Sequence, residues 1–307
     1  MDLRSTILGL TLSLLLGNGA VVAGANYNKG MGMIASGDAE AALEFWIPLA
    51  EQGDADSQVG LSILYSIGLS VPENHETAAK WVILAAEQGH RLAQYNLGIS
   101  YETGDGVLQN DKTALKWYTK SAEQGLDIAQ YELGIRFIAG NGVPQDLKTA
   151  SKWFRLAAEQ GHAQAQANLG LMYNKGDGVL ENHKTAVKWY AKAAERGNAQ
   201  GQVRLGYMYH NGMGVLENHK TAVKWYTAAA KQGEASAQGY LGVMYAIGAG
   251  VLTDTKRAYM WFSISSFNGN ETANGNKDLA AEKMTYAHLL EAQDMSSRCL
   301  ESNYTDC

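Results

Sequence analysis

The sequence predicts an all-α protein, a solenoid of 36-residue helix–turn–helix repeats. The stretch from His162 to Gly197 matches near copies of itself when it is shifted by 36 residues in either direction. A fixed period of about 20 to 50 residues is typical of solenoids, in which each repeat packs only on its neighbours. Three columns keep this interval, namely the tryptophans Trp81, Trp117, Trp153, Trp189, Trp225 and Trp261, the aromatic residues Tyr101, Phe137, Tyr173, Tyr209 and Tyr245, and the glycines Gly89, Gly125, Gly161, Gly197 and Gly233.

The first half of each repeat is predicted to be a helix, such as the one expected over residues 90–103. Ala93, Leu97 and Tyr101 are four residues apart and therefore share one helical face. Gly98 interrupts this helix, and a glycine inside a helix costs about 1 kcal/mol relative to alanine. Because this glycine recurs, we expect it to let a neighbouring helix approach closely. It recurs as Gly134, Gly170, Gly206 and Gly242.

Glycines two residues apart, such as Gly104 and Gly106, end this helix and provide the positive φ of a cap and a tight loop. A phosphate-binding loop is the alternative, but capping is a sufficient explanation at helix ends. A column of asparagine or aspartate follows, and these types cap helix N-termini. It predicts a second helix that carries the tryptophan, which we assign to the core. The column is Asn74, Asn110, Asp146, Asn182, Asn218 and Asp254.

The repeats fill most of the chain. We expect a degenerate helix pair over residues 26–53, with Phe45 in the tryptophan column, and six repeats over residues 54–268. Residues 269–307 are expected to hold capping helices and a cysteine-containing tail, with Thr285 as the N-cap of the last helix. Terminal repeats degenerate because their outer faces meet water instead of another repeat.

Residues 1–25 have the layout of a secretory signal peptide. A positive charge near the start is followed by an apolar run over residues 7–16, and small residues then suit cleavage after Ala23 or Ala25. The run is too short for a comfortable membrane span, and an uncleaved amphipathic helix is the alternative. We therefore expect a periplasmic or secreted protein with no membrane span after cleavage.

The chain has two cysteines, Cys299 and Cys307. In an exported protein such an isolated pair predicts a disulfide that ties the tail to the last helix, whereas a cytosolic protein would keep two free thiols. Net charge is −6 and the pI is about 5.7, without a lysine or arginine run. These values argue against nucleic acid and against an anionic membrane surface as partners.

The pattern AxxQxxLGxxYxxGxGVxxNxxxAxKWYxxAAEQG, present from Ala93 to Gly125, resembles the Sel-one-like repeat, a relative of the tetratricopeptide repeat. The resemblance covers nearly all of residues 26–307. It implies α/α pairs that wind into a right-handed superhelix with a concave surface, and a role as an adaptor for proteins or peptides. Cysteine-rich members of the family are linked to β-lactam binding or hydrolysis. This chain lacks the cysteines of those repeats, which argues against that activity.

Catalytic and metal-binding motifs are missing from the sequence. There is no GxSxG, HExxH or Walker loop, and no SxxK paired with KTG. His75, His183 and His219 share a column, but equivalent positions on stacked repeats lie at least about 8–10 Å apart, too far to share an ion. A glutamate recurs two residues before the repeat glycine, as at Glu51 and Glu195, and is replaced by Lys231 before Gly233. It is a lone carboxylate and is interpreted as structural. We expect no enzyme activity, no metal and no cofactor.

Variation against the periodic background marks the candidate binding surface. Three columns on one face of the first helix differ from repeat to repeat, and in tetratricopeptide-like solenoids this helix lines the concave groove. An ordinary solvated face is the alternative, and the methionines are either an adaptable apolar strip or core filler. The candidate partner-binding residues are Asn96, Ser100, Glu132, Arg136, Asn168, Met172, Arg204, Met208, Tyr240 and Met244.

The sequence therefore predicts a monomeric, exported scaffold that binds a protein or peptide partner in its concave groove. Two other hypotheses remain open. One is a hydrolase that acts on β-lactams or the cell wall, and the other is a passive structural spacer of the envelope.

Overall fold

The computed structural model describes residues 24–307, which form sixteen α-helices and no strand. The all-α prediction is confirmed for this part of the chain. The predicted signal peptide lies outside the described residues, apart from its last two positions. Between residues 24 and 307, no helix is long and apolar enough to cross a membrane.

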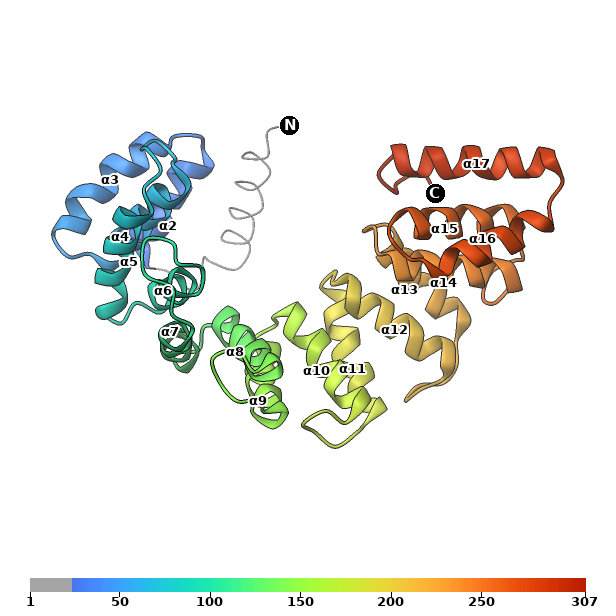
Figure 1. The fold of residues 1–307 in the computed structure, drawn as a ribbon, viewed down its shortest axis with the longest axis horizontal. Helices are drawn as coiled ribbons and strands as arrows, with labels where there is room; N and C mark the ends of the chain where they lie inside the picture. Colours follow the sequence, from blue (N-terminus) through green and yellow to red (C-terminus); the bar gives the residue numbers. More distant parts are fainter. Residues whose placement is uncertain (1–23) are drawn as a thin grey trace. The chain divides into compact units, whose positions relative to one another are not determined.

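The helices follow one another as antiparallel pairs, and we call the first member of a pair helix A and the second helix B (Figure 1). The A helices are α4 (Ala55–Ile67), α6 (Arg91–Thr103), α8 (Asp127–Ala139), α10 (Ala163–Lys175), α12 (Ala199–Asn211) and α14 (Ala235–Ile247). The B helices are α5 (His75–Glu87), α7 (Asp111–Glu123), α9 (Leu147–Glu159), α11 (His183–Glu195), α13 (His219–Ala230) and α15 (Thr255–Phe267). One pair precedes them, α2 (Ala25–Ala35) and α3 (Ala39–Glu51), and α16 (Thr272–Glu282) and α17 (Tyr286–Glu301) follow.

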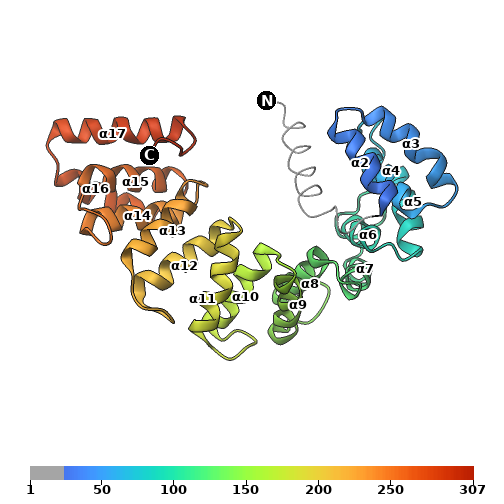
Figure 2. The ribbon, with the colours of Figure 1, turned by 180° about the vertical axis from the view of Figure 1, so that it is seen from behind.

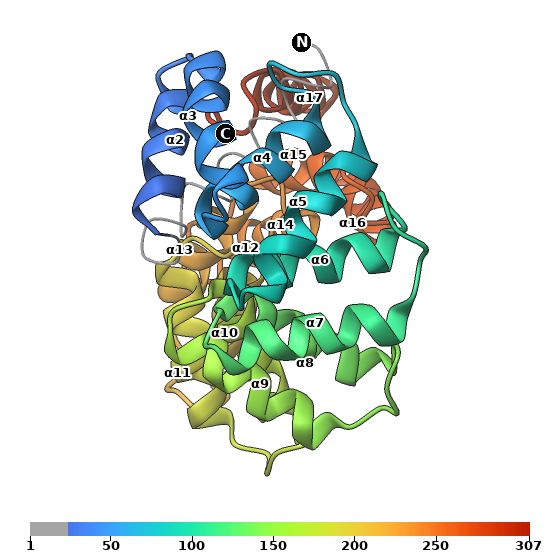
Figure 3. The same ribbon diagram turned by 90° about the vertical axis from the view of Figure 1, so that its left-hand side faces the viewer.

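The chain divides into two compact units, Met1–Leu156 and Ala157–Cys307. In the first unit, each helix from α2 to α8 packs on the next, and α5, α6 and α7 are seen running antiparallel in Figure 3. In the second unit, successive helices from α10 to α16 pack in the same way. The last helix, α17, lies on α15, as the view from behind also shows (Figure 2).

The buried core residue of each repeat is the one that follows the tryptophan column, and it is aromatic in every repeat but one. This column is at most 3% exposed, and it consists of Trp46, Val82, Tyr118, Phe154, Tyr190, Tyr226 and Phe262. The residues of the tryptophan column itself, from Trp81 to Trp225, are only half-buried, and its last member, Trp261, is 3% exposed. Our assignment of the tryptophan column to the core is thus off by one residue. The indoles of Trp117 and Trp189 instead carry a lysine ammonium 4.0 and 4.3 Å from the ring centroid.

The recurring glycine of helix A makes room for that buried ring. A Cβ built on Gly98 would lie 2.7 Å from a ring carbon of Tyr118, and one on Gly242 would lie 2.5 Å from Phe262. Carbon atoms normally approach to about 3.5–4.0 Å, so a side chain at either position would overlap the ring. The predicted close approach is confirmed, and the approaching group is a side chain of helix B.

One repeat solves the same packing problem differently. In the pair formed by α4 and α5, Ser62 stands in the glycine column and Val82 in the aromatic column. Both residues are buried, at 5% and 3% exposure. A larger residue on helix A is therefore matched by a smaller one on helix B. The two columns complement each other in volume.

The predicted helix caps are confirmed. Each asparagine or aspartate of the column accepts a hydrogen bond from the amide three residues later, at 2.9–3.1 Å, as Thr285 does from His288 at 3.3 Å. The glycine doublets adopt positive φ, with 84° at Gly104 and 71° at Gly106. Ser70 takes the place of the second glycine in its repeat and has φ 59°.

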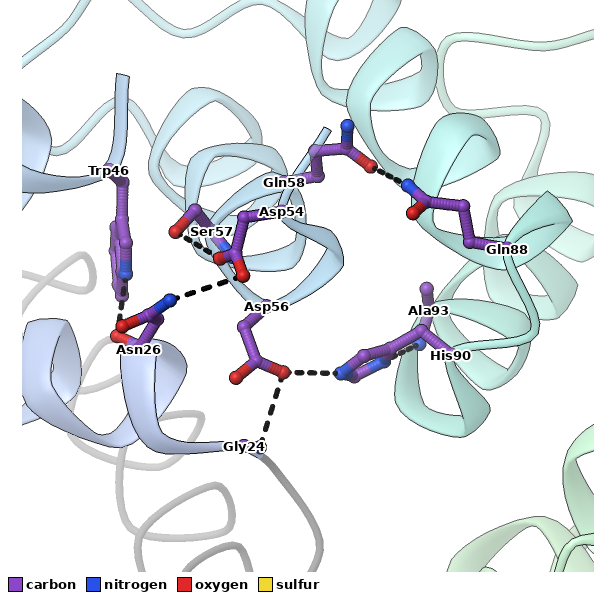
Figure 4. Close-up of polar contacts among 10 residues, drawn as sticks. All are labelled: Gly24, Asn26, Trp46, Asp54, Asp56, Ser57, Gln58, Gln88, His90 and Ala93. Carbon is purple, nitrogen blue, oxygen red and sulfur yellow. Dashed lines mark hydrogen bonds and ion pairs between the residues drawn. The ribbon is translucent and has the colours of Figure 1, made fainter. Parts of the chain in front are cut away.

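A network of buried glutamines joins successive repeats, and sequence reasoning missed it. Gln58 donates through Nε2 to the carbonyl of Ala50 at 3.1 Å, and its Oε1 accepts from Gln88 at 2.8 Å (Figure 4). The first bond recurs for Gln94, Gln130, Gln166, Gln202 and Gln238. The second recurs from Gln124 to Gln94, from Gln232 to Gln202 and from Asn268 to Gln238.

The two ends of the described chain are tied down by polar contacts. Trp46 donates to the carbonyl of Asn26 at 3.0 Å, and Asp56 faces His90 at 3.1 Å (Figure 4). At the other end, Cys299 and Cys307 form the expected disulfide, with their Cα atoms 4.9 Å apart. Cys299 is fully buried, so the bridge holds the tail against α17.

Candidate functional site

The structure divides the predicted binding residues into a surface group and a buried group. Arg204 is exposed, and the half-buried residues are Asn96, Ser100, Glu132, Asn168 and Tyr240. The other four are at most 3% exposed, and they are Arg136, Met172, Met208 and Met244. The surface group comes from one helix A column, to which Ser100 is the only addition. We call this surface the helix A face.

The buried group corrects the predicted surface. The column of Met172 lies three residues after a buried leucine, and three residues turn a helix about 60° short of a full circle. Its side chains therefore point toward the core edge and not toward solvent. Of the two interpretations of Met172, Met208 and Met244, core filler is the one that their burial supports. They offer no surface to a partner.

Arg136 is the one charged residue in the column of Met172. Its guanidinium forms ion pairs with Glu102 and, at 3.1 Å, with Glu132, and it lies 4.6 Å from the ring centroid of Tyr118. The Tyr118 hydroxyl donates to Glu102 at 2.7 Å. A buried charge is tolerated only when it is paired, and two carboxylates supply the pairing here.

The pKa shifts in this cluster follow from burial and charge. Desolvation raises the pKa of Glu132, and the positive charge of Arg136 opposes this effect. Desolvation lowers the pKa of Arg136, but Glu102 and Glu132 outweigh it and the net shift is upward. Burial, together with its bond to Glu102, raises the pKa of Tyr118. The guanidinium therefore stays charged and the phenol stays protonated.

The second unit carries the same tyrosines without their acidic partner. Tyr190 and Tyr226 occupy the column of Tyr118 and are at most 1% exposed, yet their hydroxyls have no hydrogen-bond partner among the described residues. The position equivalent to Glu102 holds Asn174 beside Tyr190 and His210 beside Tyr226. Burial raises the pKa of Tyr190 to about 12, and the charge of Arg204 opposes this.

Aromatic rings lie next to the second of these tyrosines. Tyr226 stacks on Tyr240 with centroids 4.8 Å apart, and Tyr240 meets the exposed Tyr207 at 6.2 Å. His210 faces His219 at 5.1 Å, and burial together with the positive charge of His219 lowers the pKa of His210. The helix A face of the second unit thus combines aromatic surface, an exposed cation and buried hydroxyl donors.

The histidine column does not gather into a metal site. Each histidine begins a B helix and pairs with the glutamate two residues before it, as His75 does with Glu73 at 3.1 Å and His219 with Glu217 at 3.1 Å. Among residues 24–307, no three histidine, cysteine or acidic side chains converge as metal ligands would. What the described surface offers chemically is recognition, through hydrogen bonds, charge and ring contacts.

Sequence reasoning missed the tyrosine column and the residues that face its hydroxyls. The signal was present, because an aromatic residue follows the tryptophan in most repeats, as in the Lys-Trp-Tyr of residues 188–190. Which of two adjacent aromatic residues is buried depends on a helix rotation of about 100°. The periodicity of the columns is identical for both and could not decide it.

Comparison with known proteins identifies the repeat. The Sel1 repeat matches residues 20–54, 55–90, 91–126, 127–162, 163–198, 199–234 and 235–269. A search of curated proteins gave no match. The chain is similar to a Sel1 repeat protein from Oxalobacter formigenes, with 33% identity and a TM-score of 0.69 over 79% of this chain and 97% of the other.

A second solved structure supports the same conclusion. It is a protective antigen of uropathogenic Escherichia coli strains that displays an SLR fold, with 30% identity and a TM-score of 0.58 over 91% of this chain and 69% of the other. Sel1 repeats typically mediate protein–protein interaction, and such scaffolds are generally not enzymes. The repeats, their helix pairs and these likenesses agree, and the chain belongs to the Sel1 repeat family.

Proposed function

We propose that this protein is an exported adaptor that binds a protein or peptide segment through its helix A face, the surface that the concave groove of the predicted superhelix presents. The observation that carries the proposal is the distribution of variation. Residues that build the repeat are nearly constant, whereas one column that reaches the surface changes between amide, acidic, basic and aromatic side chains, as Asn96, Glu132, Arg204 and Tyr240 show.

The exposed chemistry of this column supports recognition of a polypeptide. Arg204 offers a guanidinium with no ion pair among the described residues, and Tyr207 and Tyr240 of the same unit offer ring surface. Arginine and tyrosine are enriched where protein partners bind most strongly. Asn96 and Asn168 can donate to and accept from a peptide backbone.

Export is supported by two features of the chain. The disulfide between Cys299 and Cys307 is of a kind that persists in oxidising compartments. Residues 1–25 have the signal-peptide layout described above. These two features support a periplasmic or secreted adaptor, and we propose that it acts as a monomer.

The test is photocrosslinking in the protein's own source cells, with benzoylphenylalanine at position 96, 168 or 204. A matched control places the same group at Lys80, Lys152 or Lys188, which are exposed on B helices. We expect a discrete protein adduct from the helix A positions and none from the lysine positions. Equal adducts from both sets, or none from either, would refute the helix A face as the binding surface.

A variant series asks whether the same surface determines affinity. Asn96, Asn168 and Arg204 are changed together to alanine, and the three lysines are changed together as the control. Glu132 is left intact, because its removal would leave Arg136 buried with one carboxylate fewer. Partner capture should be lost only with the first variant. A chromogenic β-lactam added to the wild type should stay intact, and its turnover would favour the hydrolase instead.

A further inference from the structure

The repeats allow one position to be compared within a single molecule. In the first unit, the buried Tyr118 hydroxyl donates to Glu102 at 2.7 Å, and Arg136 neutralises the same carboxylate. A tyrosine hydroxyl and a guanidinium thus hold one carboxylate. Two repeats further along, Tyr190 stands where Tyr118 does, and the carboxylate is gone, because Asn174 replaces Glu102.

Asn174 does not replace the lost acceptor. Its side chain is one methylene shorter than that of glutamate, and its Oδ1 and the Tyr190 hydroxyl both remain without a hydrogen-bond partner among the described residues. A buried hydroxyl left unpaired costs about 1–3 kcal/mol. Tyr190 is 1% exposed, so solvent does not pair with it as it would at a surface. The second unit therefore keeps the buried hydroxyl donor of Tyr190 and lacks the carboxylate that accepts from Tyr118 in the first unit.

The guanidinium is present in the second unit as well, from a neighbouring position. Met208 replaces Arg136, but Arg204 lies one turn earlier in the same helix, at the position equivalent to Glu132. The Glu132 side chain reaches Arg136 at 3.1 Å, so this position extends toward the tyrosine column. Arg204 is exposed and forms no ion pair with any residue in the described range.

The place that the Glu102 carboxylate takes in the first unit can be reached from solvent. In the first unit, the side chain of Glu102 is 41% exposed while it accepts from the buried Tyr118 hydroxyl. The place of its carboxylate is therefore open to solvent even though the phenol beneath is not. The Tyr190 hydroxyl and Asn174 Oδ1 are both buried, so the Asn174 side chain has to turn aside in the second unit for the same approach.

We propose that the Tyr190 hydroxyl and the Arg204 guanidinium bind an acidic side chain of a partner peptide, in the place that Glu102 occupies two repeats earlier. The inference rests on the proposed function, since it names the chemistry that the helix A face recognises in the second unit. A charge-assisted hydrogen bond and an ion pair on one carboxylate are stronger than either is with a neutral amide.

The direct test is NMR of protein labelled in tyrosine rings and arginine Nε–H groups. The probe is the blocked tripeptide acetyl-Ala-Glu-Ala-amide, titrated into the millimolar range. We expect saturable shifts of the Tyr190 ring and Arg204 signals, weakened by salt. Acetyl-Ala-Gln-Ala-amide should leave both signals in place. The free acid acetyl-Ala-Gln-Ala should bind more weakly; a stronger response to it would replace the acidic side chain with a chain terminus and overturn the proposal.

Variants drawn from the chain's own repeats sharpen the test. Tyr190→Phe puts in the residue that Phe154 already is in this column, and it should weaken glutamate-peptide binding about tenfold. Asn174→Glu restores the residue that Glu102 is, and its carboxylate should occupy the site itself. That variant should lose the peptide response and gain about 2–4 °C in Tm. Asn174→Ala is the matched control, because it brings no acceptor and no longer side chain into the site, and it should keep the response.

The outcomes separate this inference from the proposed function. An unchanged peptide response in Asn174→Glu, or equal shifts with the glutamine peptide, would overturn the carboxylate site while crosslinking at the helix A face still stands. Conversely, a peptide response that the variants abolish, combined with equal crosslinking from helix A and helix B positions, would keep the carboxylate site and reject the adaptor face.

Discussion

A double substitution tests whether the glycine column of helix A and the aromatic column of helix B complement each other in volume. The change is made at Gly242 and Phe262, which should accept Ser and Val because Ser62 and Val82 hold those places in another repeat. We consider each single variant and then the pair. If the two columns complement each other in volume, the double variant should be more stable than the sum of the single losses allows.

The magnitudes follow from the geometry. A Cβ at residue 242 would lie 2.5 Å from a Phe262 ring carbon, about 1 Å inside normal contact. In Gly242→Ser, overpacking of this kind should lower the free energy of unfolding by about 1–3 kcal/mol. Replacing glycine inside a helix should restore about 0.5 kcal/mol of that loss. Phe262→Val removes buried ring volume and should cost about 2–3 kcal/mol. In the double variant the serine fills part of that space, so about 1–2 kcal/mol should return as coupling.

The assay is urea unfolding of the wild type, both single variants and the double variant, followed by circular dichroism at 222 nm. The slopes are compared first, because free energies can be combined in a cycle only if all four proteins unfold with the same slope. A coupling energy below about 0.5 kcal/mol would mean that the two sites act independently. That result would refute the volume rule.

Three further changes test single features of the repeats. Ser70→Gly should stabilise the protein by about 0.5–1 kcal/mol in urea unfolding, because Ser70 has φ 59° where five other repeats have glycine; no gain would mean that this loop carries no strain. Arg196→Gln should add about 0.5–1.5 kcal/mol, since Gln166 Oε1 lacks the donor that Gln232 gives to Gln202, and an unchanged Tm would contradict this reason. Burial raises the pKa of Asp54, but its bonds to Ser57 and Asn26 outweigh this and leave the pKa lowered in the folded state. Stability should therefore be full above the unfolded pKa of about 3.9 and fall as pH drops toward the folded value. Asp54→Asn should lose part of that acid dependence in unfolding curves between pH 7 and 3, and an identical pH profile would exclude Asp54 as its source.

Much of the fold could be predicted because capping and periodicity are local. An asparagine such as Asn182 accepts from the amide three residues later, and no distant residue is needed to make that bond. The glycine of helix A was also informative, because its cost in a helix demands a reason. Its partner could not be predicted, since Tyr190 and Trp189 are neighbours with the same period and only the packed structure shows which one turns inward.

The candidate site was predictable only in part for the same reason. Arg204 and Tyr240 were found because they vary in a repeating column. Met172 was assigned to that surface too, although it lies close enough to the buried stripe to be in the core. The Tyr190 hydroxyl could not be found from the pattern, because its importance lies in a bond that Tyr118 makes and Tyr190 does not. That contrast is visible only when both repeats are seen in three dimensions.

The glutamine network has a consequence for how long such an array can be. Each glutamine needs a carbonyl from the repeat before and an amide from the end of its own repeat, so one 36-residue unit brings one full set of donors and acceptors. Removing one whole repeat, such as residues 91–126, would join equivalent positions of its two neighbours, and every hydrogen bond of this network could still form. Removing half a unit would strand a carbonyl on one side and an amide on the other. Asn268 makes the final bond with a shorter side chain, at the end of the last repeat. The array can therefore gain or lose whole 36-residue repeats and keep the hydrogen bonds of its glutamine network.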